Sequence, residues 1–132
     1  MYGNQGDYTK ALEWHQKALK IRKQVLGNEH PDTAYSYNNI AYMYSFQGDY
    51  TYALECYLKA LKIREQVLGS EHLDTAESYN NIAMVYYNQG DYTKALEGFQ
   101  KALAIYEKRL GGNHPNTSAI RNNIAETRKK LN

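Results

Sequence analysis

The sequence repeats itself with a period of 42 residues. Residues 6–47 and 48–89 are identical at 30 of 42 aligned positions, and residues 90–131 follow the same frame with more substitutions toward the end. A period of this length is typical of arrays in which each unit packs on its neighbours instead of closing one common core. The repeat therefore argues against most single-core folds.

Each unit carries the pattern of a long helix followed by a shorter one. In residues 7–26 the apolar side chains recur at spacings of three, four and seven, which places them on one helical face. Residues 31–46 show the same spacing from Ala34 to Tyr44. We predict six helices and no strands, with the helices at residues 7–26, 31–46, 49–68, 73–88, 91–110 and 116–131.

A Gly-Asp pair precedes each long segment, at residues 6–7, 48–49 and 90–91. Glycine tolerates the left-handed conformation that ends a helix, and aspartate accepts hydrogen bonds from the free amides that begin one. The pair is therefore predicted to stop one helix and start the next. Pro31 suits the first turn of the following short helix, where no amide donor is needed.

Alanine and tyrosine recur at the predicted helix contacts. The alanines would let two helix axes approach closely, and the tyrosines would fill the space around them. The recurring alanines are Ala41, Ala53, Ala60, Ala83, Ala95 and Ala102. This pattern is explained by packing alone.

The two ends of the chain depart from the repeat. Residues 1–5 align with the end of a short helix, so residues 1–132 are expected to form a single array that starts mid-repeat, with units 6–47, 48–89 and 90–131. In the last unit, Arg121 and Arg128 replace the tyrosines of the earlier units. Such polar replacements are typical of a terminal repeat, so residues 116–132 are predicted to be a C-terminal capping helix.

Composition and charge narrow the class of function. A formal net charge of +2, with acids and bases interleaved, disfavours nucleic acid as the partner. A single cysteine, Cys56, excludes an internal disulfide, and no apolar run is long enough for a membrane span, so we expect a cytoplasmic protein that binds no membrane.

We expect no enzyme activity, no catalytic residues, no metal and no cofactor. The histidines that recur once per unit would lie about 10 Å apart in stacked helix pairs, too far for one zinc ion with bonds of about 2 Å. They are interpreted as residues that anchor loops. The recurring histidines are His30, His72 and His114.

The signature residues resemble those of tetratricopeptide repeats. In the first full signature these residues are Tyr37, Ile40, Ala41, Tyr44, Ala53, Tyr57 and Ala60. The unit is eight residues longer than the usual 34, and in this it is similar to the repeats of kinesin light chains. The resemblance implies an all-α fold, a right-handed α-solenoid of helix-turn-helix repeats, which serves as a protein interaction scaffold.

The resemblance also implies a concave groove, lined by the short helices, that holds an extended peptide or a helix of a partner protein. An asparagine before the signature isoleucine-alanine pair would hold the peptide backbone, because an amide offers both a donor and an acceptor. The candidate groove residues are Tyr35, Asn38, Asn39, Tyr42, Phe46, Asn80, Asn81, Met84, Tyr87, Asn88, Asn122, Asn123 and Glu126.

Three alternatives stay open at this stage. The asparagine pairs would also recur if their amides bonded only to neighbouring backbone. The uncovered helix at residues 7–26 could instead receive the last helix of another copy and give a homo-oligomer, either as head-to-tail chains or rings or as a swapped dimer. The close similarity of the units also fits an engineered or consensus-derived array without a native ligand.

Overall fold

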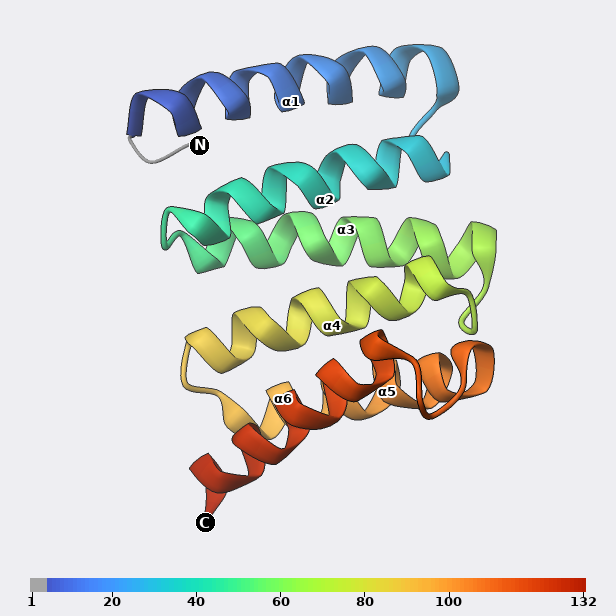
Figure 1. Ribbon diagram of the computed structural model, residues 1–132. Coiled ribbons are helices and arrows are strands. Elements are labelled where there is room, and N and C mark those ends of the chain that lie inside the picture. The colour runs from blue at the N-terminus through green and yellow to red at the C-terminus, as the bar shows by residue number, and fades with distance from the viewer. Residues whose placement is uncertain (1–4) are drawn as a thin grey trace. The chain divides into compact units, whose positions relative to one another are not determined.

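The computed structural model describes residues 5–132, and all regular structure in this part of the chain is α-helical (Figure 1). Every predicted helix is present, with bounds that agree within two residues. The helices are α1 (Gln5–Leu26), α2 (Pro31–Phe46), α3 (Tyr50–Leu68), α4 (Leu73–Asn88), α5 (Tyr92–Leu110) and α6 (Pro115–Leu131). The all-α repeat fold is therefore confirmed.

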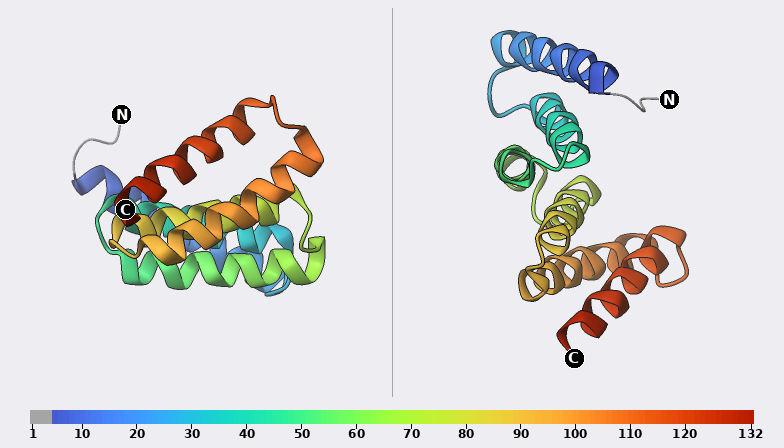
Figure 2. Two further views of the ribbon diagram at one scale, coloured as in Figure 1. Left: turned by 90° about the horizontal axis from the view of Figure 1, so that it is seen from below. Right: turned by 90° about the vertical axis from the view of Figure 1, so that its left-hand side faces the viewer.

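The chain forms two compact units. Unit 1 comprises Met1–Val67 and unit 2 comprises Leu68–Asn132. In unit 1, α1 packs against α2, and in unit 2, α5 packs against both α4 and α6. The hairpin of α5 and α6 is visible from two directions (Figure 2). No helix in the described residues is long and apolar enough to cross a membrane.

The loop between each long helix and the next short helix has one hydrogen-bond pattern. A histidine Nδ1 accepts the backbone N–H two residues further on, at 3.0, 3.0 and 3.1 Å. A buried threonine then donates its hydroxyl to the carbonyl of the glycine after the long helix, at 2.8, 2.7 and 2.9 Å. The predicted loop-anchoring role of the histidines is confirmed. The capping histidines are His30, His72 and His114, and the threonines are Thr33, Thr75 and Thr117.

The Gly-Asp pairs act as predicted at two of their three positions. Gly48 and Gly90 have φ values of 86° and 85°, which let the chain turn back after a short helix. Asp49 Oδ1 and Asp91 Oδ1 then accept N–H groups in the first turn of α3 and α5. These aspartates cap the helices from outside, so α3 and α5 begin one residue later than predicted.

The prediction was wrong at residues 6–7, which lie inside α1. The physical reason is that the backbone at Gly6 continues α1, so Gly6 does not take the left-handed conformation of Gly48 and Gly90. The predicted helix remnant at residues 1–4 lies outside the described residues.

Small residues form the centre of both cores. In unit 2, Ala83, Ala95, Ala102 and Phe99 are fully buried, with Ile120 and Ile124 of α6 packed beside them. In unit 1, the core around α2 and α3 comprises Ala34, Tyr37, Ala60 and Ile63, with Leu19 of α1 against it. The predicted alanine contacts are thus confirmed.

The arginines of α6 lie on the surface. Arg121 donates to the Gly112 carbonyl at 2.7 Å and to Glu107 Oε2 at 2.6 Å. The tyrosine of the earlier units is thereby replaced by a hydrogen-bonded ion pair with α5. That α6 caps the array stays a prediction.

Candidate functional site

Two cavities lie in unit 2 where α4 and α6 approach each other beside α5. Both are lined from all three helices, and they share Asn123. Each helix contributes residues because α5 packs against α4 on one side and α6 on the other. Together the two cavities make a cleft, which we call the α4–α6 cleft.

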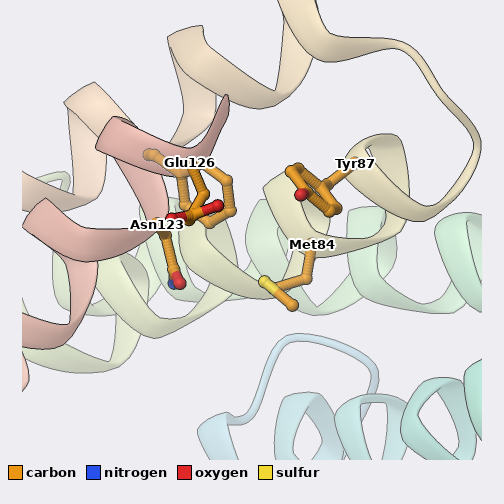
Figure 3. A pocket seen from close by; sticks show the side chains of 5 residues that line it. Met84, Tyr87, Asn123 and Glu126 are labelled. Carbon is orange, nitrogen blue, oxygen red and sulfur yellow. The ribbon is translucent and has the colours of Figure 1, made fainter. Parts of the chain in front are cut away.

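The first cavity is small and mainly apolar, with a volume of about 140 Å³. Met84 and Tyr87 extend into it from α4, and Asn123 and Glu126 from α6 (Figure 3). Phe99 of α5 completes the lining and is itself fully buried. Such a lining suits an apolar side chain, whose neighbouring backbone would meet the polar side chains of α6.

The second cavity is larger, about 280 Å³, and mainly polar. Its lining includes one carboxylate, four amides, one tyrosine ring and two small or apolar side chains. The residues are Glu77, Asn80, Asn81, Tyr106, Asn116, Ala119, Ile120 and Asn123. Of these eight residues, none is basic, so the cavity has the electrostatic character of a site for a cation or for hydrogen-bond donors.

Asn80 has an unusual environment within this polar cavity. Its Oδ1 atom is buried and has no hydrogen-bond partner in the structure. A buried carbonyl oxygen without a partner costs about 1–3 kcal/mol, and most such atoms in folded proteins are hydrogen-bonded. Asn80 therefore contributes to the polar cavity an amide whose oxygen lacks a donor.

The α4–α6 cleft brings together six of the predicted site residues and leaves the others elsewhere. Those brought together are Asn80, Asn81, Met84, Tyr87, Asn123 and Glu126. Asn88 and Asn122 are exposed and line neither cavity.

The remaining predicted residues belong to α2 in unit 1. Tyr35, Tyr42 and Phe46 are 53%, 55% and 58% exposed, and Asn38 and Asn39 are half-buried. The Tyr42 and Phe46 rings lie 5.5 Å apart in an edge contact. Their exposure is compatible with the predicted contact role, which stays a prediction.

The predicted set omitted six residues that line the cleft in unit 2. Phe99 stands where the preceding unit has the signature residue Tyr57, and the sequence gives no sign that a fully buried ring also borders a cavity. Tyr106 carried a usable signal, because the two earlier units have Arg22 and Arg64 at this position. The other omitted residues are Glu77, Asn116, Ala119 and Ile120.

The titratable groups with a shifted pKa lie outside the cleft. Burial raises the pKa of the Cys56 thiol, which keeps it in the weakly nucleophilic protonated form. Lys108 donates a hydrogen bond to the Glu71 carboxylate and lowers the pKa of that exposed group. In the described residues no group of three or more histidines, cysteines, aspartates or glutamates is arranged to hold a metal ion.

A sequence profile described as Tetratricopeptide repeat matches the chain at residues 1–66, 37–108 and 74–132. A search among curated protein sequences gave no match.

Solved structures give close matches over 96% of this chain at 26% identity. The crystal structure of BtubC (BKLC) from P. vanneervenii aligns with a TM-score of 0.88. A Podosopora anserina protein, named as a kinesin light chain with nearly identical TPR-like repeats, aligns with a TM-score of 0.87. The chain covers 50% and 60% of those two proteins, so it spans little more than half their length.

Proposed function

Because the chain belongs to the tetratricopeptide repeat family, whose members generally mediate protein–protein interaction, we propose that it binds an extended peptide of a partner protein in the α4–α6 cleft. No catalytic step is assigned to it. The single observation that carries the proposal is the cleft itself, in which an apolar cavity and a polar cavity meet at Asn123.

The chemistry of the cleft fits a peptide backbone flanked by side chains. Asn81 and Asn123 are equivalent residues of successive units and line the same polar cavity. Each amide carries a donor and an acceptor, which match the carbonyl and N–H of one peptide group. The apolar cavity beside Asn123 would take a side chain of the bound peptide. Affinity would come from the amides and selectivity from the cavities.

The test begins with short linear peptides of random sequence, displayed on phage and selected on the intact chain. Affinity of a selected peptide is then measured by fluorescence anisotropy. Asn81→Ala and Asn123→Ala should each weaken binding by about tenfold, the effect of one lost hydrogen bond of about 1.4 kcal/mol. Gln100→Ala removes an exposed amide of α5 outside both cavities and should leave affinity unchanged.

The midpoint of thermal unfolding shows whether a variant that loses affinity has also lost stability. It should stay within a few degrees for all three variants, since both asparagines are only half-buried. Failure to select any peptide, or unchanged affinity in both asparagine variants, would refute the proposed function.

Self-association is a second candidate function, carried by one face of α1. Trp14, Ile21 and Val25 are spaced by seven and four residues, which places them on one side of the helix, and they are 73%, 59% and 74% exposed. In unit 2 the corresponding face of α5 includes Ala102 and Ile105, which are buried by the neighbouring helices. A short helix of a second copy is therefore the occupant we propose for the α1 face.

Light scattering at several protein concentrations tests this candidate. Oligomers that grow with concentration are expected, and Trp14→Gln combined with Val25→Gln should shift them to a monomer. Lys20→Gln, at another exposed position of α1, serves as the control and should leave the oligomers intact. A monomer at every concentration would exclude self-association of this chain.

A further inference from the structure

One arginine in the repeat is replaced only in the third unit. Arg22 in the first unit donates to Ser36 Oγ at 2.8 Å and to the Asp32 carbonyl at 3.2 Å, and so joins the long helix to the short one. Arg64 is the equivalent residue of the second unit and is only 3% exposed. In the third unit this position is Tyr106. The guanidinium of the earlier units has no counterpart there.

The serine partner changes together with the arginine. Ser36 and Ser78 of the first two units correspond to Ile120 in the third. Both substituted residues, Tyr106 and Ile120, line the polar cavity of the α4–α6 cleft. The cavity of about 280 Å³ thus lies at the site of the changed pair.

An acceptor group in the same cavity is left without a donor. Asn80 Oδ1 is buried and unpartnered, whereas Asn38, its equivalent in the first unit, interacts with another residue. Glu77 adds a carboxylate to the lining, at a position where the other units have Tyr35 and Ala119. A negative charge and an unused acceptor therefore line one cavity that has no basic residue.

We propose that the polar cavity takes an arginine side chain of the bound peptide, an inference that rests on the proposed peptide-binding function. A guanidinium has five N–H donors in a plane, no acceptor, and a flat face that stacks on aromatic rings. Asn80 Oδ1 and the Glu77 carboxylate provide acceptors, and the ring of Tyr106 provides a stacking surface. The arginine of the ligand thereby supplies a guanidinium where the first two units have Arg22 and Arg64 and the third has Tyr106.

The distance between the two cavities also sets how many residues separate the arginine of the bound peptide from its apolar side chain. Glu77 borders the polar cavity and Met84 borders the apolar one, and they are separated by seven residues of α4. This separation corresponds to about 10 Å along the helix, which an extended peptide spans with about three residues. The peptide should carry an apolar side chain about three residues from its arginine.

The recognition of arginine is tested first with single blocked amino acids. N-acetyl-arginine amide, the corresponding lysine compound and the corresponding citrulline compound are titrated into the intact chain, followed by nuclear magnetic resonance of the asparagine side-chain amides. The arginine compound should shift the Asn80 and Asn81 amide signals and bind at least about threefold more tightly than the lysine compound. Equal shifts with citrulline, or none with arginine, would overturn the inference.

Substitution of a carboxylate that lines the cavity is then compared with substitution of one outside it, which distinguishes a specific contact from general electrostatic attraction. Glu77→Gln should weaken binding of the arginine compound by about fivefold, the effect of removing a charged hydrogen-bond acceptor. Glu97→Gln removes an exposed carboxylate of α5 outside both cavities and should have no effect. Equal loss in both variants would show nonspecific attraction and overturn the site.

A double variant restores the pair found in the first two units. Tyr106→Arg with Ile120→Ser should place the chain's own guanidinium in the cavity. It should weaken a selected arginine-containing peptide by about tenfold and leave a peptide with citrulline in place of that arginine unchanged. If Ile120→Ser impairs folding, Tyr106→Arg alone gives the same comparison, because Ile120 lies in the core while Tyr106 is only half-buried.

The outcomes distinguish this inference from the proposed function. If no peptide is selected at all, peptide binding itself fails. If peptides are selected, but their affinity is the same with arginine or citrulline, peptide binding stands and the arginine site is refuted. Selection of peptides with an arginine about three residues from an apolar side chain would support both.

Discussion

Phe99→Ala is expected to lower the free energy of unfolding by about 3–5 kcal/mol, the range for removal of a buried aromatic ring. The side chain of Phe99 is fully buried among the alanines of α4 and α5 and the isoleucines of α6. Alanine would extend the apolar cavity of the cleft, since Phe99 lines it, and the small neighbouring side chains have little capacity to fill the space. Denaturant unfolding monitored by circular dichroism measures this loss.

The matched control is Phe99→Leu, which retains most of the apolar volume and should cost less than about 1.5 kcal/mol. Amide hydrogen exchange then locates the effect, and faster exchange is expected in α4, α5 and α6. A loss below about 1 kcal/mol for Phe99→Ala would contradict the prediction. It would mean that the three helices close around the missing ring.

Gly98→Ala is expected to destabilise unit 2 by about 1–3 kcal/mol, although alanine is the better helix former by about 1 kcal/mol. A Cβ atom at this position would lie 2.9 Å from Ala83 Cβ and 3.3 Å from the Tyr79 carbonyl oxygen. Neither group can rotate away, because one is an alanine side chain and the other is helix backbone. The overlap therefore outweighs the gain in helix propensity, and thermal unfolding should show a lower midpoint.

Ala83→Gly provides the rescue for this substitution. It removes the nearer contact atom, so Gly98→Ala combined with Ala83→Gly should be more stable than the sum of the two single effects predicts. The coupling energy from this double-mutant cycle is the decisive measurement. A stabilising Gly98→Ala, or a coupling energy of zero, would show that α4 and α5 do not approach as closely as described.

The periodic features of the fold could be predicted from the sequence because each is a local and repeated requirement. The short helices α2 and α4 have the predicted bounds, since a proline or leucine after a capping histidine starts them and a glycine in the left-handed conformation follows them. Ala83 and Ala102 could be assigned to helix contacts for the same reason. Residues 6–7 could not be predicted correctly, since the same Gly-Asp pair follows a helix end at residues 48–49 and lies inside a helix at residues 6–7.

The cleft could be predicted only in part. The repeat indicated that Asn81 and Asn123 share a face, and in the structure both line the polar cavity. It could not show that Asn80 Oδ1 lacks a partner, because that depends on atoms from three helices. Tyr106 departs visibly from the arginines of the two earlier units. A tyrosine in a helix is ordinarily a packing residue, however, and only the structure shows that this one lines a cavity.

The close approach of α4 to α5 also limits which long helix of the repeat could stand in the position of α5. The position of Gly98 is occupied by Trp14 in the first unit and by Cys56 in the second. A long helix bearing tryptophan there could not replace α5, since even a methyl group meets Ala83. The three units are therefore not interchangeable parts, despite their similarity. Moving the first unit to the position of the third would require a smaller residue in place of Trp14 at this one contact.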